Sequence, residues 1–344
     1  MFFYTVFFLL TYQSSKLQRP FGQKSLQWSR AILVAGLMWL LMGFRDQTVA
    51  GDTIAYVSDF LNKPIQWLTI GDFLSETREP LFYLLEWLCQ KITSSYTVYL
   101  FITSLMVAVG FFDLLKNYSD DMFLSVLIFS CIGSMYFCMA GLRQAIAMGV
   151  TMLAFRFARE RRLLMFSLLC FIAYEFHNSA NVFALVYPIV NWSASWKSWL
   201  AVIVFAYLGI TRNESVMTAA NYFTARDYEM AEVGLNHTMF FIQLVFVIFC
   251  FVYERVYKKM GVDPDFNSFL LLSFIGLCYQ SLTPIRGEFF RVSSYFSVYL
   301  CLAVPRVFTW INKEEKGIIY PMMTISILAY IYIFGAAKSY MTCF

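Results

Sequence analysis

Three short polar segments interrupt an otherwise apolar sequence and contain residue types that could catalyse group transfer. In the first segment, Asp52, Tyr56 and Asp59 follow an i, i+4, i+7 spacing. This spacing places them on one face of a helix that begins at an Asp52 cap. Such a face could bind sugar hydroxyls or supply a general base. On spacing alone, a solvated and capped helix explains the same residues equally well.

The second segment is the entry to an apolar helix, where Gly141 and Leu142 precede Arg143 and Gln144. An arginine at this position is costly unless it is paired or faces water, and intramembrane ionisable groups are functional candidates by default. The planar guanidinium of Arg143 suits two phosphate oxygens. Snorkelling of the same side chain to the membrane interface is the alternative.

The third segment interrupts another apolar stretch with Glu175, His177, Asn178, Ser179 and Asn181. His177 could act as a general base or donate a hydrogen bond to phosphate. The chain has only two histidines and no metal-ligand spacing, so we expect no metal site. The alternative is a histidine at a helix break whose ring is satisfied by backbone carbonyls.

A further polar cluster lies near the C-terminal end, where Arg286 and Glu288 precede Arg291 and Tyr295. Glu288 and Arg291 are three residues apart, and Arg291 and Tyr295 are four apart, so one helix face could present an acid, a cation and a phenol. A surface ion pair explains the first two residues equally well.

The elements that must position these residues are membrane helices. Of the 344 residues, 60% are hydrophobic and only 14% are charged, and the mean hydropathy is +0.61. This composition excludes soluble enzyme folds and predicts an all-α polytopic membrane protein, with residues 1–344 forming a single integral membrane domain. The length accommodates about ten to twelve spans. The net charge of +4 is too small and too dispersed to suggest nucleic-acid binding.

Lysine and arginine in short loops favour the cytoplasmic side and decide two ambiguous stretches. Basic clusters occur at residues 16–30, 156–162, 255–259 and 313–316. All four can be cytoplasmic if Leu81 to Cys89 is an interfacial or re-entrant helix and if Leu163 to Val190 is two short helices broken near His177 and Asn178. The result is about twelve membrane helices with both termini outside. The predicted spans are 2–11, 28–44, 96–115, 122–139, 143–157, 163–175, 180–190, 199–210, 238–252, 266–282, 292–310 and 318–335.

On this topology the polar segments gather at the outer face. Outer loops are expected at residues 43–80 and 211–237, and the polar segments include four arginines, several carboxylates and a histidine. The first helix has no basic n-region, so we expect it to be retained rather than cleaved as a signal peptide. The eight cysteines lie mostly in apolar runs and are interpreted as packing residues.

The ordered set of polar motifs resembles the EpsG family of bacterial membrane proteins, within the Wzy-like polysaccharide and O-antigen polymerases. The motifs that carry the resemblance are Phe44-Arg45 followed by Gly51-Asp52 and Tyr56, Arg78-Glu79-Pro80-Leu81-Phe82, Leu142-Arg143-Gln144-Ala145-Ile146-Ala147, His177-Asn178-Ser179-Ala180, and the helix from Arg291 to Tyr295-Phe296. They cover residues 43–296.

The resemblance implies a polymerase in the bacterial cytoplasmic membrane. Its substrate would be oligosaccharide repeat units carried on undecaprenyl diphosphate, joined at the outer face without a metal or cofactor. Its partners would be this lipid-linked substrate and the bilayer, and a chain-length regulator could be a further one.

The implied chemistry assigns roles to the candidate residues. Arg143 and Arg291 would bind the diphosphate, with Arg45 or Arg286 assisting. Either Asp52 or His177 would be the base. The remaining candidates would bind or position substrate: Tyr56, Gln144, Asn178, Glu288 and Tyr295.

Three other functions remain open from the sequence. An O-antigen ligase-like glycosyltransferase would use the same donor with a different acceptor. A flippase or other transporter would carry polar residues along the whole depth of its path and often shows internal repeats. A non-catalytic scaffold would not need arginines at the outer face. The sugars, and whether the product is O-antigen, capsule or exopolysaccharide, are not encoded in these motifs.

Overall fold

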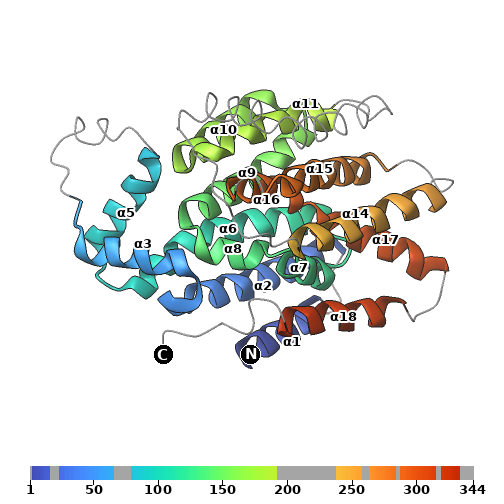
Figure 1. The fold of residues 1–344 in the computed structure, drawn as a ribbon, viewed down its shortest axis with the longest axis horizontal. Helices are drawn as coiled ribbons and strands as arrows, with labels where there is room; N and C mark the ends of the chain where they lie inside the picture. Colours follow the sequence, from blue (N-terminus) through green and yellow to red (C-terminus); the bar gives the residue numbers. More distant parts are fainter. Residues whose placement is uncertain are drawn as a thin grey trace.

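The computed structural model describes residues 2–15, 23–65, 79–191, 238–257, 263–283, 287–314 and 319–333, and within these ranges every regular element is a helix (Figure 1). The first half contains α1 (Phe2–Ser15), α2 (Gln23–Gly43), η1 (Gln47–Val49), α3 (Gly51–Asn62), α5 (Pro80–Ile92), α6 (Tyr96–Tyr118), α7 (Met122–Cys131), α8 (Ser134–Ala140) and α9 (Leu142–Arg159). The second half contains α10 (Leu163–Phe176), η2 (Asn178–Leu185), α11 (Val186–Asn191), α14 (Thr238–Tyr257), α15 (Pro264–Ser281), α16 (Glu288–Ser297), α17 (Leu300–Glu314) and α18 (Ile319–Ile333).

Fewer helices than expected are long and apolar enough to cross a membrane. In the described ranges four qualify, at Leu26–Gly43, Tyr96–Tyr118, Thr238–Arg255 and Glu288–Ile311, and a fifth is obtained if α7 and α8 form one bent span. The described ranges therefore confirm an all-helical protein with four or five candidate spans but do not confirm the expected twelve, because several predicted spans are short or broken helices. The predicted span 199–210 and the predicted loop 211–237 lie outside the described residues.

Two breaks in helices shape the region near the polar segments. The span expected at 122–139 is wrong as a single helix, because α7 and α8 meet at an angle of 64°. Gly133 allows this bend by adopting a positive φ of 76°, which glycine tolerates without a steric penalty. The break predicted near His177 is confirmed, since α10 ends at Phe176 and His177 has an extended backbone before η2.

Helices α6 and α9 pack closely at the centre of the bundle. A Cβ atom added to Gly110 would lie 2.2 Å from the carbonyl oxygen of Gly149, and one added to Gly149 would lie 2.3 Å from that of Met106. Glycine at both positions therefore lets the two backbones meet directly, as at small-residue interfaces between membrane helices. This contact fixes α9, which carries Arg143 at one end and Arg159 at the other.

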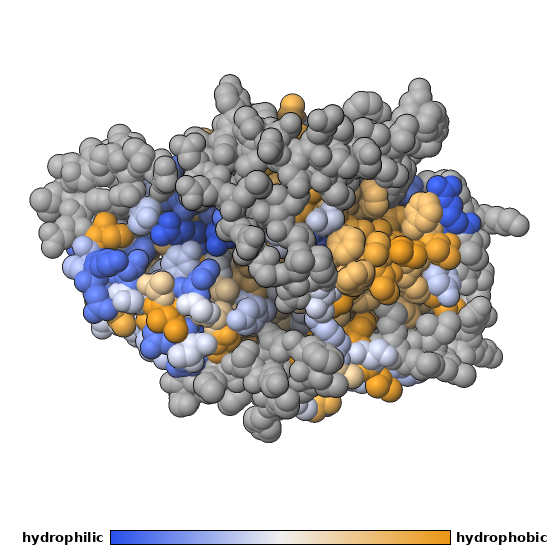
Figure 2. All heavy atoms as spheres, in the orientation of Figure 1, coloured by the Kyte–Doolittle hydropathy of each residue, from blue (hydrophilic) through white to orange (hydrophobic). Residues whose placement is uncertain are grey.

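Charged residues gather at the two ends of this bundle. Helix α9 has 18 residues and is therefore about 27 Å long, close to the thickness of a bilayer core. Ion pairs at its C-terminal end join Arg156 to Asp113 at 2.8 Å and Arg159 to Asp265. Figure 2 shows hydrophilic side chains at the end of the molecule formed by α3 and α5, and a broad hydrophobic surface around α14.

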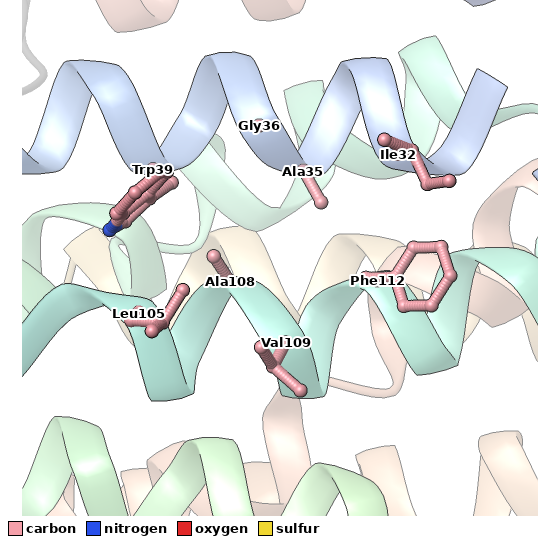
Figure 3. Close-up of a pocket in the computed structure, with 8 residues that line it drawn as sticks. All are labelled: Ile32, Ala35, Gly36, Trp39, Leu105, Ala108, Val109 and Phe112. Atoms are coloured by element: carbon pink, nitrogen blue, oxygen red, sulfur yellow. The ribbon is translucent and has the colours of Figure 1, made fainter. Parts of the chain in front are cut away.

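An apolar groove of about 230 Å³ runs between α2 and α6. Figure 3 shows its lining side chains, among them Ile32 and Trp39 from α2 and Leu105 and Phe112 from α6. The Trp39 indole N–H donates to the carbonyl of Phe101 at 2.8 Å, so its polar atom is satisfied within the protein. None of the candidate site residues lines this groove.

Candidate functional site

Glu79 lies at the centre of the polar residues contributed by α5, α9 and η2. It immediately precedes Pro80, the first residue of α5, and has a left-handed backbone with φ of 58° and ψ of 48°. Few non-glycine residues adopt this conformation, and such strain persists only where surrounding contacts impose it. The side chain is only 3% exposed, so its carboxylate must find its hydrogen-bond partners within the protein.

The two oxygens of the Glu79 carboxylate bind different partners. Arg143 Nη1 donates to Oε2 at 2.9 Å. His177 Nδ1 forms a hydrogen bond with Oε1, and the backbone N–H of Asn178 donates to the same oxygen at 3.4 Å. The carboxylate therefore joins the start of α9 to the break between α10 and η2.

These partners keep Glu79 ionised. Burial by itself raises the pKa of Glu79, but the hydrogen bonds and charges of His177 and Arg143 outweigh it and lower this pKa to about 2. A carboxylate with so low a pKa is a poor proton acceptor near neutral pH. Its role in the site is to orient and stabilise its partners.

The contact with Glu79 sets the orientation of the His177 ring. An ionised carboxylate only accepts hydrogen bonds, so the proton of a neutral imidazole lies on Nδ1 and the lone pair lies on Nε2. Nε2 makes no hydrogen bond to any residue in the described ranges. The geometry therefore leaves Nε2 available to accept a proton.

Aromatic rings surround the Arg143 guanidinium. Its central carbon lies 4.9 Å from the centroid of Phe82, 5.0 Å from that of Tyr83 and 5.6 Å from that of Tyr56. The side chain is 27% exposed, and Nη2 donates to no residue that the structure describes. Arg143 is thus held by rings and by one carboxylate oxygen, and one arm of its fork remains for an anionic ligand.

A second arginine is tied to the same turn of α9. Gln144 Nε2 donates to the backbone carbonyl of Arg291 at 2.5 Å. The guanidinium of Arg291 is exposed and forms no ion pair with a described residue. Tyr295, one turn further along α16, is buried and its hydroxyl lies 3.2 Å from Ser179 Oγ. The residues predicted at three separate segments therefore meet in space.

The positive charges of Arg143 and Arg291 act on the phenol of Tyr56. Burial raises the pKa of the Tyr56 phenol, and the charges of Arg143 and Arg291 partly oppose that effect. Tyr56 lies on α3 with its ring centroid 5.6 Å from the central carbon of the Arg143 guanidinium. Its hydroxyl keeps its proton and can therefore donate as well as accept a hydrogen bond.

Some expectations about the first segment need correction. Ala50, not Asp52, is the N-cap of α3, and Asp52 lies exposed in the first turn. Asp59 lies on the same helix but pairs with Lys63 at 2.7 Å. Arg45, expected to assist at the diphosphate, is fully buried and donates to the carbonyls of Met42 and Met139.

The predicted common face of α16 is only partly formed. Glu288 and Arg291 are exposed, whereas Tyr295 is 1% exposed and packs inside the bundle. No ion pair joins Glu288 to Arg291. Arg286 lies outside the described residues.

Sequence reasoning did not select Glu79 or Tyr83 as site residues. The signal that could have identified Glu79 is an acid directly before the proline that begins an apolar helix, where a charged side chain needs a partner. Tyr83 carried no such signal, because an aromatic residue in an amphipathic helix is usually a packing residue.

The site combines an anion-binding part with a proton-accepting part. Two arginines can stabilise negative charge, and a histidine oriented by a carboxylate can accept a proton. In the described ranges, no group of three or more His, Cys, Asp and Glu side chains is arranged to hold a metal ion.

Comparison with known proteins identifies a family for the chain. The chain matches no curated protein and no solved structure. The family model of the EpsG family matches residues 31–343, which include every residue of the candidate site. The chain therefore belongs to the EpsG family, a family of Wzy-like polysaccharide polymerases.

Proposed function

We propose that this protein is a membrane glycosyltransferase that polymerises oligosaccharide repeat units carried on undecaprenyl diphosphate, at the outer face of the bacterial cytoplasmic membrane. The observation that carries the proposal is the buried Glu79 carboxylate, which binds Arg143 with one oxygen and His177 with the other. Membership of the EpsG family supports a polymerase of polysaccharides, and the geometry suits the chemistry of transfer from a diphosphate.

The acceptor part of the reaction involves His177. Nε2 of His177 accepts the proton of a hydroxyl on the incoming lipid-linked unit as that oxygen attacks the anomeric carbon of the growing glycan. Glu79 accepts the Nδ1–H hydrogen bond and stabilises the imidazolium that forms. Asp52 is the less suitable base, because it is exposed in the first turn of α3.

The leaving-group part of the reaction involves the arginines. As the new glycosidic bond forms, the bond between the anomeric carbon and the phosphate oxygen breaks and its electron pair stays on the diphosphate. The free arm of Arg143 and the exposed guanidinium of Arg291 stabilise the charge that develops there. The proton taken by His177 later leaves to solvent or to the diphosphate.

The location at the outer face is supported by the distribution of basic residues along α9. Arg143 lies at its start, and Arg156 and Arg159 lie near its end, so the site and a basic cluster lie at opposite ends of one helix. Basic clusters in short loops favour the cytoplasmic side. The short and broken helices pack with the longer ones, which supports our proposal that they complete a bundle of about twelve membrane helices.

Gene deletion and complementation in the host test the function. The lipid-linked glycans and the surface polysaccharide are analysed by gel electrophoresis and mass spectrometry. Single repeat units at the surface, without polymer, would support a polymerase. Polymer of normal length that stays on its lipid carrier would instead indicate a ligase, and repeat units trapped inside would indicate a flippase.

Variants in the deletion strain test the assignment of residues. At equal expression, Arg143→Ala and Arg291→Ala should each yield single repeat units. Arg162→Ala is the matched control, because Arg162 is exposed beyond the other end of α9, at the N-cap of α10, and its ion pair with Glu160 is long at 3.6 Å. Normal polymer from both arginine variants would contradict the proposed diphosphate site. A matching loss in His177→Gln but not in Asp52→Asn would identify the base.

A further inference from the structure

The carbonyl oxygen of Met139 accepts two hydrogen bonds from side chains of other elements. Arg45 Nη2 donates to it at 2.9 Å and Thr53 Oγ1 donates to it at 2.8 Å. Met139 lies in the last turn of α8, where backbone carbonyls have no partner within the helix. The two donors therefore stabilise the position of the C-terminal end of α8.

Arg45 is itself rigidly held. It is fully buried, Nη1 donates to the carbonyl of Met42, and the same nitrogen lies 3.3 Å from Ser104 Oγ on α6. A buried cation is costly, and well-packed apolar residues often replace such a group without loss of stability. Stability alone therefore does not account for Arg45, whereas its fork joins the ends of α2 and α8 to α6.

The junction between Met139 and Arg143 has little freedom. Gly141 is both the C-cap of α8 and the N-cap of α9. Its N–H donates to the carbonyl of Phe137 at 2.9 Å, and its carbonyl accepts from the N–H of Ala145 at 2.8 Å. A shift of the Met139 carbonyl is thus transmitted to the first turn of α9.

That first turn contacts both arginines of the anion-binding part of the site. Arg143 contributes its own guanidinium, and Gln144 holds the backbone carbonyl of Arg291 at 2.5 Å. The position of this turn therefore determines how Arg143 contacts Glu79. It also determines the distance between Arg143 and Arg291.

We propose that Arg45 and Thr53 are positioning residues, which act through the carbonyl of Met139 to place Arg143 and Arg291 for the transfer reaction. The inference rests on the proposed function. Neither side chain needs to touch substrate, since Thr53 is also fully buried.

Thr53→Val gives the sharpest test, because it removes one hydroxyl and preserves the branched shape, whereas Arg45→Ala could prevent folding by opening a large cavity. Thr53→Ser keeps the donor. Thr151→Val is the matched control, since Thr151 is equally buried but bonds the carbonyl of Met148 within its own helix. Each purified protein is assayed for polymerisation of lipid-linked repeat units in proteoliposomes, with kcat and KM determined separately and thermal unfolding measured in parallel.

In Thr53→Val, displacement of the arginines should lower kcat roughly tenfold to a hundredfold. The KM and the unfolding temperature of this variant should stay close to those of wild type. Thr53→Ser should restore kcat, and Thr151→Val should leave it unchanged. Equal kcat in Thr53→Val and wild type would overturn the inference while leaving the polymerase function intact. A loss of kcat matched by Thr151→Val would also overturn it, as a general effect of removing a buried hydroxyl. Absence of polymer with wild-type protein would instead count against the proposed function.

Discussion

Arg143 Nη1 lies 2.9 Å from Glu79 Oε2, although 64 residues separate the two in the sequence. The other oxygen of this carboxylate binds His177, which is 98 residues from Glu79. A single buried anion therefore fixes the cation and the imidazole relative to each other. Both are positioned before substrate arrives, which is the arrangement that electrostatic catalysis requires.

Replacement of Glu79 by glutamine should abolish most of the activity. The amide preserves the size of the side chain but removes the charge, and one of its terminal atoms becomes a donor that cannot accept from Arg143 or His177. We expect the rate of polymerisation to fall on the order of 10²-fold or more. Polymer length and rate should be compared with those of Glu175→Gln, a half-exposed carboxyl in the last turn of α10. Similar activity in both variants would refute the role of Glu79.

Lysine should replace Arg291 better than it replaces Arg143. The Arg143 guanidinium lies within 5.6 Å of three aromatic centroids and also binds Glu79, a planar arrangement that an ammonium cannot reproduce. Arg291 is exposed, and only its backbone carbonyl is held by Gln144. Polymer yield should therefore stay close to zero in Arg143→Lys and partly recover in Arg291→Lys. Equal recovery in both would show that only charge matters at Arg143.

The stability of the protein should depend on pH through Glu86. Burial in α5 raises the pKa of Glu86 to about 7, with Arg143 opposing and Asp59 adding to the shift. In the unfolded chain the carboxyl has a pKa of about 4.3. The folded state therefore binds more protons between these values, and the contribution of this residue to stability, complete at lower pH, is lost as the pH rises through about 7.

The measurement is thermal unfolding in detergent from pH 4.5 to pH 8. The unfolding temperature of wild type should fall over this range relative to that of Glu86→Gln, whose side chain does not titrate. Parallel curves for the two proteins would contradict the assignment.

The close contact of α6 and α9 should tolerate no methyl group at Gly149. An added Cβ would lie 2.3 Å from the backbone oxygen of Met106, which cannot move without separating the helices. We expect Gly149→Ala to destabilise the fold by about 1–3 kcal/mol. Gly36→Ala is the control, because its Cβ would meet no atom within 4 Å. Thermal unfolding that is unchanged in Gly149→Ala would mean that the helices are not packed this closely.

Much of the helical organisation is predictable from the sequence. The predicted span 96–115 corresponds to α6 at Tyr96–Tyr118, and 163–175 corresponds to α10 at Leu163–Phe176. Long apolar runs bounded by charges determine such helices locally, and the balance of basic clusters correctly located the break at His177. The bend at Gly133 was missed, because an apolar run gives the extent of hydrophobic sequence but not the direction of the chain within it.

The candidate site likewise has features that follow from local sequence and features that follow from tertiary contacts. The sequence by itself determined which residue types stand at the ends of apolar helices, and so selected Arg143, His177 and Arg291. Only the tertiary structure decided that Glu79 joins the first two and that Arg45 is fully buried, where it donates to the carbonyl of Met139. The physical reason is that these relationships are contacts between distant parts of the chain. They depend on how α5, α8, α9 and α10 pack, and no local pattern of residues encodes that packing.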